Sequence, residues 1–92
     1  MNIPAITSIN DALKIYYNNS EIGNKEIKEL FGSRSPTTIS RLKSIVKEEM
    51  RERNVVSYGI YKINTRVAFD VWGINVTDLE NRKKKMDKLK LS

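Results

Sequence analysis

Hydrophobic residues recur at helical spacing twice in the first third of the chain. Between residues 6 and 17, apolar side chains stand three or four positions apart, which predicts a helix that Ser8 caps. A shorter apolar repeat over 25–31 predicts a second helix, with Asn24 as its cap and Gly32 as its stop. Each helix is expected to bury one face only, because its remaining positions are polar.

A third helix has the strongest start signal in the sequence. Ser35 is a good N-cap, and Pro36 suits the first helical position, where its missing N–H costs nothing. Apolar residues then repeat at intervals of three and four positions, as far as about residue 52. We expect this stripe to face the core, and it consists of Ile39, Leu42, Val46 and Met50.

The segment 54–63 has a different pattern. β-Branched and aromatic residues surround Gly59, and this composition predicts a short β-hairpin that would form a wing beside the helices. An extended strap packed against the helices is the alternative.

Two further helices are predicted toward the C-terminus. One covers about 65–73 and is apolar on most sides, so we expect it to be largely buried. The other covers about 77–90, where Thr77 begins a capping box and the apolar seam is thin. The expected fold class is mostly α, with a three-helix core, the hairpin and these two helices in one domain, 1–92. Aromatic residues at helical spacing are assigned to the core, namely Tyr16, Tyr17, Phe69 and Trp72.

Composition narrows the chemistry open to this chain. Its 92 residues include no Cys and no His, which excludes disulfides, thiolate and imidazole metal sites, and His-dependent catalysis. The sequence has no conspicuous carboxylate pair and no glycine-rich phosphate loop. We therefore expect no catalytic residue, no metal, no cofactor and no small-molecule substrate, and we do not expect an enzyme.

The charge balance favours a polyanionic partner. Seventeen Lys and Arg against eleven Asp and Glu give a net charge of +6. Most of the excess lies in residues 34–66, where eight basic residues stand against three acidic ones. The run Lys83-Lys84-Lys85 could bind a nucleic-acid backbone or lie on a membrane surface, but its narrow apolar seam argues against a membrane. A solvated helix face fits this run best.

One stretch carries a family resemblance. Residues 23–43 read GNKEIKELFGSRSPTTISRLK: a short helix ending in Leu-Phe-Gly, a polar turn and a longer, capped helix. The stretch resembles a helix-turn-helix DNA-binding unit, with its two helices over about 24–52. Lys28 stands where many such motifs carry a small residue, and the turn from Gly32 to Ile39 is one residue longer than usual. A winged or otherwise modified variant therefore fits better than the tight bihelical form.

The face of the third helix opposite its apolar stripe is polar and cationic. Arg41 has the reach and the forked geometry to bind guanine O6 and N7, and the small hydroxyl residues suit phosphates or a thymine methyl. Arg34, Lys43 and Lys47 suit the phosphate backbone. Lys62 and Arg66, near the predicted hairpin, suit the adjacent minor groove or phosphates, and ordinary surface charge is the alternative for these two. An ordinary solvated face is the alternative. The candidate DNA-binding residues are Arg34, Ser35, Thr37, Thr38, Ser40, Arg41, Lys43, Ser44, Lys47, Lys62 and Arg66.

A weaker resemblance indicates a biological setting. The small size, the abundance of Asn, Ile and Lys, and the stretch INTRVAFDVWGI at 63–74 are similar to small regulators encoded by phages and mobile elements of Gram-positive bacteria. This resemblance implies a transcriptional regulator or an excisionase-like architectural factor. The N-terminus lacks a signal-peptide pattern and apolar runs are short, so we expect a cytoplasmic protein without membrane contact.

Double-stranded DNA is the expected partner. One such unit reads only a few base pairs, so a homodimer formed through the last helix is a further expectation. The alternative is a protein-interaction module that binds another regulator or a replication or host protein, its charge serving solubility. RNA ranks lower, because the sequence has no motif of stacking aromatic residues.

Overall fold

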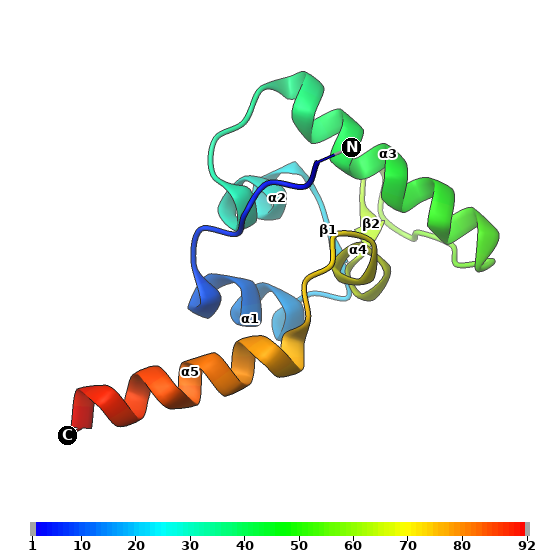
Figure 1. Ribbon diagram of the computed structural model, residues 1–92. Coiled ribbons are helices and arrows are strands. Elements are labelled where there is room, and N and C mark those ends of the chain that lie inside the picture. Colours follow the sequence, from blue (N-terminus) through cyan, green and yellow to red (C-terminus); the bar gives the residue numbers. More distant parts are fainter. Residues whose placement is uncertain (1, 92) are drawn as a thin grey trace.

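Five helices and one two-stranded sheet make up the described part of the chain, residues 2–91 of the computed structural model (Figure 1). The protein is therefore mostly α, as predicted. In chain order the elements are α1 (Ile9–Asn18), β1 (Glu21–Ile22), α2 (Asn24–Phe31), α3 (Pro36–Glu52), β2 (Ile63–Asn64), α4 (Thr65–Val71) and α5 (Val76–Leu91).

Local capping signals place the starts of three helices where the sequence predicts them. Ser8 Oγ accepts a hydrogen bond from the Asp11 amide at 3.2 Å, at the start of α1. Ser35 Oγ accepts one from the Thr38 amide at 3.2 Å, and Pro36 is the first residue of α3. At α4 the cap is Asn64, whose Oδ1 accepts from a backbone amide one turn later.

In the other two helices the N-cap lies earlier than expected, by one residue at α2 and by two at α5. At α2 the N-cap is Gly23, whose amide donates to Glu26 Oε1 at 2.8 Å, while the side chain of Asn24 points elsewhere. At α5 the Asn75 Oδ1 accepts from the Asp78 amide at 3.0 Å, so Thr77 lies inside the helix. Asn is a stronger N-cap than Thr, which explains the shift at α5.

The core lies where the helices converge, with the apolar stripe of α3 buried along its length. Phe69 and Trp72 are buried, as predicted, and Tyr16 is half-buried against the Phe69 ring. Tyr17 was also expected in the core, but it is 62 % exposed because it lies on the outer side of α1, where its hydroxyl bonds to Glu80 of α5.

The predicted hairpin within 54–63 is wrong. Within residues 2–91, the only strand pairing joins β1 and β2, antiparallel, with Ile22 opposite Ile63 and both fully buried. Among the described residues, 54–62 contain no strand and run as a loop with a turn near Gly59. The loop has no partner strand because side chains from elsewhere, described below, satisfy its backbone groups.

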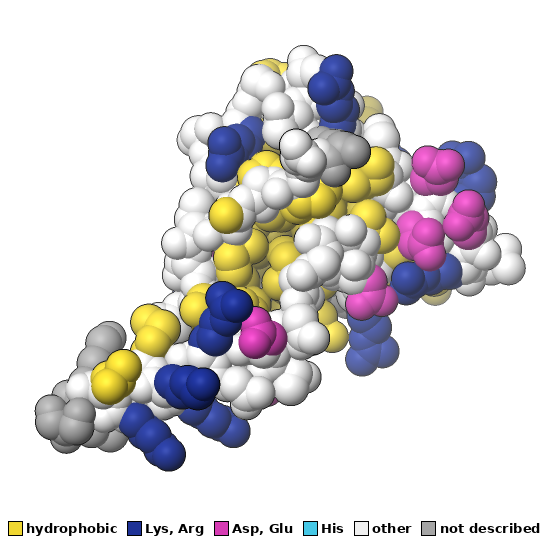
Figure 2. All heavy atoms as spheres, in the orientation of Figure 1, with side chains coloured by type: hydrophobic (Ala, Val, Ile, Leu, Met, Phe, Trp, Pro, Cys, Tyr) yellow, Lys and Arg dark blue, Asp and Glu magenta, His cyan; other side chains and the backbone are white. Residues whose placement is uncertain are grey.

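The last helix extends away from the body of the protein (Figure 1). Its first turn packs on α1 and buries Leu79, whereas residues 81–89 are all exposed. Of the predicted apolar seam, Met86 and Leu89 are therefore at the surface, 46 % and 75 % exposed. Basic side chains lie along this helix in Figure 2. No helix within residues 2–91 has the length and apolar content needed to cross a bilayer.

Candidate nucleic-acid interface

The turn between α2 and α3 is built by glycine, arginine and serine. Gly32 ends α2 with φ +82°, a backbone conformation that favours glycine. Arg34 then donates from Nε to the Phe31 carbonyl oxygen at 3.0 Å. This bond fixes the root of the guanidinium at the end of α2 and leaves the remaining four N–H donors of the group for other partners.

The open face of α3 carries most of the predicted residues. Ile39 and Leu42 face the core, so the opposite side of the helix is left to solvent. Because successive residues turn by about 100°, two exposed rows result, one following Ser40 toward Lys47 and one following Thr37 toward Arg41. Thr38, by contrast, is half-buried, and its hydroxyl is within 3.0 Å of Ser35 Oγ. The exposed predicted residues of this region are Arg34, Ser35, Thr37, Ser40, Arg41, Ser44 and Lys47.

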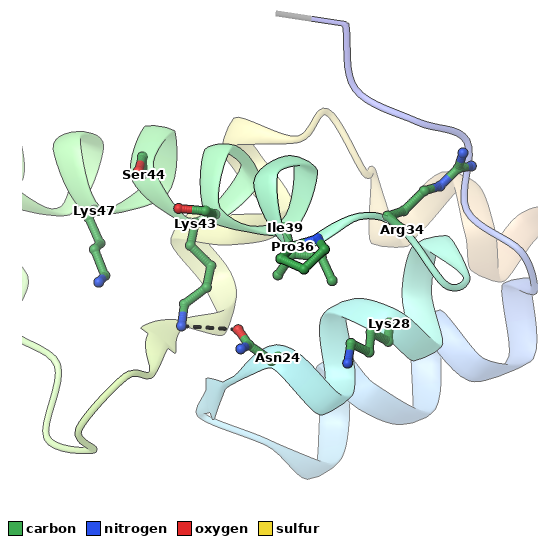
Figure 3. A pocket seen from close by; sticks show the side chains of 9 residues that line it. Asn24, Lys28, Arg34, Pro36, Ile39, Lys43, Ser44 and Lys47 are labelled. Atoms are coloured by element: carbon green, nitrogen blue, oxygen red, sulfur yellow. Dashed lines mark hydrogen bonds between the residues drawn. The ribbon is translucent and has the colours of Figure 1, made fainter.

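A groove of about 430 Å³ separates α3 from α2 (Figure 3). Five predicted residues line it, joined by two side chains of α2 and by two residues of the α3 core edge. Four of the lining side chains are cationic, and among the described residues that line the groove none is acidic. The lining consists of Asn24, Lys28, Arg34, Pro36, Ile39, Ser40, Lys43, Ser44 and Lys47.

Lys43 occupies a different place from the one expected. Instead of standing free on the flank of α3, it is only 9 % exposed, and its Nζ donates to Asn24 Oδ1 at 3.2 Å and to the Tyr61 carbonyl oxygen at 2.7 Å. Burial lowers the pKa of this ammonium, and the charge of Lys47 lowers it further. Lys43 thus joins α2, α3 and the following loop, and its charge adds to the field in the groove.

Lys62 and Arg66 lie outside the groove lining. Lys62 is exposed in the loop directly after Tyr61, whose carbonyl Lys43 binds. Arg66 is exposed on α4 and lines a separate hollow with Tyr16 and Thr65. The structure therefore brings together Arg34, Ser40, Lys43, Ser44 and Lys47, and it sets Arg66 apart from them.

Two polar residues of the groove are not among the candidates predicted from the sequence. Asn24 and Lys28 stand four positions apart on α2, and Figure 3 shows them on the side of that helix that faces α3. The signal was present, because Ile27 and Leu30 define the buried face of α2 and leave these two positions on one exposed row. Lys28 was noted only as a departure from a family pattern.

Acidic residues of α3 are kept at its far end. Glu49 binds Arg53 at 2.9 Å, and the same guanidinium binds Asp70 of α4 at 3.0 Å. Figure 2 shows most of the acidic side chains visible in that view near this end of the molecule. The described lining of the groove thus contains cationic side chains and no acidic one, a distribution that attracts anions.

The described residues contain no group of three or more acidic, Cys or His side chains that could hold a metal ion. The site offers cationic side chains, hydroxyls and amide groups, which recognise anions and hydrogen-bonding edges. Comparison of the chain with protein-family models, with curated proteins and with solved structures finds no match.

Proposed function

We propose that this chain is a sequence-specific double-stranded DNA-binding protein of the helix-turn-helix type, in which α3 enters the major groove. One observation carries the proposal: Lys28, Arg34, Lys43 and Lys47 converge on a groove whose described lining has no acidic residue. Such a field attracts the phosphate backbone, which supplies most of the non-specific affinity of DNA-binding proteins.

The connection between the two helices supports this assignment. Four residues, 32–35, separate α2 from α3, and Gly32 with its positive φ makes the sharp turn. Helix-turn-helix units join their helices by a turn of three or four residues that often contains glycine. The loop that follows α3 takes the place of a wing, and the β1–β2 ladder anchors its end.

The exposed residues of α3 and of the turn before it contact different parts of the DNA. Arg41 is the residue that reads guanine in the major groove, because its guanidinium can donate two parallel hydrogen bonds. Ser40 and Ser44 are small, so they let the helix backbone approach the DNA closely. Arg34 and Lys47, at the two ends of the groove, bind phosphates and set the register.

The protein acts in the cytoplasm as a transcriptional regulator or an excisionase-like architectural factor of a phage or mobile element. A unit of this size reads few base pairs, so a second copy on the DNA raises specificity. The exposed Met86 and Leu89 of α5 are the contact that we assign to such a homodimer.

Binding to a labelled duplex across a salt series tests the proposal. We expect the logarithm of the affinity to fall steeply with the logarithm of the salt concentration. Arg41→Ala combined with Lys47→Ala should weaken binding, whereas Lys14→Ala, an exposed cation on α1, should not. A flat salt response, or equal binding by the double variant and wild type, would overturn the assignment.

A further inference from the structure

The loop between α3 and β2 exposes an unusual amount of apolar surface. Val56, Tyr58, Ile60 and Tyr61 are 72 %, 93 %, 82 % and 79 % exposed, within six consecutive residues. Single exposed apolar side chains are common, but a contiguous group of this kind marks a contact surface. None of the elements described above covers these side chains.

The loop is held in one conformation although its side chains point to solvent. The Glu21 carboxylate accepts hydrogen bonds from the amides of Tyr58 and Gly59, at 2.7 and 2.8 Å. Ser57 Oγ donates to the carbonyl oxygens of Lys62 and Gly59, at 2.6 and 3.1 Å. Because the backbone is already ordered, binding through this loop would lose little conformational entropy.

The loop is also attached to the lining of the groove between α2 and α3. The Lys43 ammonium, which lines the groove, binds the Tyr61 carbonyl oxygen at 2.7 Å. Tyr61, the last of the four exposed apolar residues, therefore lies next to the cationic lining. A partner that lies along the groove meets both surfaces.

We propose that the loop 55–62 enters the minor groove beside the site of α3 and presses Tyr58 and Ile60 against a base-pair step, bending the DNA. The proposal rests on the DNA binding proposed above and adds a second contact with a different chemistry. Apolar side chains of minor-groove proteins partly unstack base steps and kink the duplex. Flexible pyrimidine–purine steps accept such a kink at the lowest cost.

The test compares wild type with the double variant Tyr58→Ala, Ile60→Ala on a mixed-sequence duplex that carries a FRET pair at its ends. We expect the wild type to shorten the end-to-end distance and the variant to lose this bend. Binding should weaken by roughly tenfold, as the loss of one base-step contact implies. Because both side chains are uncharged, the salt dependence of binding should stay the same.

Controls separate this inference from the proposed function. Tyr17→Ala removes an exposed tyrosine from α1, outside the groove, and should bind and bend like wild type. The single variants Tyr58→Ser and Ile60→Ser give the same readout if the double variant folds poorly. If wild type binds duplex with a steep salt dependence but the loop variants bind and bend normally, the inference fails and DNA binding stands. Loop variants that change only self-association overturn it too, and no duplex binding by wild type overturns both proposals.

Discussion

The indole Nε1 of Trp72 donates a hydrogen bond to the backbone carbonyl oxygen of Leu42, 3.1 Å away in the core. The same indole meets the ring of Phe31 edge-on, with 5.2 Å between centroids. Phe31 is the last residue of α2 and Leu42 lies in the middle of α3. One buried side chain at the end of α4 thus fixes the two helices that border the groove.

Replacing Trp72 by Phe removes the donor and leaves space in the core. We expect a loss of about 1–3 kcal/mol in the free energy of unfolding, measured by urea denaturation. Tyr58→Phe is the control, because this side chain is 93 % exposed, and its effect should stay within about 0.5 kcal/mol. Equal stability of Trp72→Phe and wild type would contradict the role assigned to the indole.

Lys43 and Lys47 form a matched pair, one turn apart on α3. Lys47→Met should lower the salt slope of DNA binding by about one, because an exposed ammonium is lost from the phosphate contact. Lys43→Met should leave the slope almost unchanged, since its ammonium already binds Asn24 and Tyr61. Equal decreases in slope for the two variants would show that Lys43 also contacts phosphate.

Substitutions of Arg41 distinguish the recognition of a base from the contribution of positive charge. Selection from random duplexes provides a preferred sequence, and Arg41→Ala should cost about 1–3 kcal/mol of binding on it. On a mixed-sequence duplex the loss should be smaller. Arg41→Lys keeps the charge but not the fork, so it should restore affinity without restoring preference. If Arg41→Ala loses the same binding free energy on both duplexes, Arg41 contacts phosphate and does not read a base.

Glu21 gives the loop a dependence on pH. Hydrogen bonds from the amides of Tyr58 and then Gly59 keep the pKa of this carboxyl below its ordinary value of 4.5. The contribution to stability is therefore present above pH 4.5 and is lost as the pH falls through the lowered pKa. In NMR titrations, the amide protons of Tyr58 and Gly59 should shift together, with a midpoint below 4.5.

The substitution Glu21→Gln is the control for that titration. It removes the ionisable group but keeps one acceptor oxygen, so the two amide signals should no longer titrate in this range. Amides that still titrate in Glu21→Gln, or a wild-type midpoint above 4.5, would contradict the assignment.

Elements fixed by neighbours in sequence could be predicted, and elements fixed by distant partners could not. Ser35 and Pro36 specify the start of α3 by themselves, and the spacing from Ile39 to Met50 specifies its buried face. The loop after α3 depends instead on Glu21, which reaches Tyr58 from 37 positions earlier. No local pattern in 54–63 reveals that contact, and the composition alone favoured a hairpin.

The candidate site likewise contains residues that local sequence predicts and residues whose placement depends on distant partners. Exposed positions such as Ser40 and Lys47 follow from the helical period of α3 alone. The burial of Lys43 depends on the Tyr61 carbonyl, 18 positions later, and on Asn24 of α2. Periodicity places Lys43 beside the core stripe but does not supply the acceptors that make its burial tolerable.

The β1–β2 ladder has a consequence for exchanging parts between proteins. Ile22 and Ile63 are cross-strand partners, so the two ends of the intervening segment lie only about 5 Å apart. That segment contains α2, α3 and the loop, and therefore the whole groove and the exposed apolar side chains of the loop. A scaffold that receives this segment must offer two adjacent attachment points, and it must also supply a carboxylate in the place of Glu21 and a buried indole in the place of Trp72.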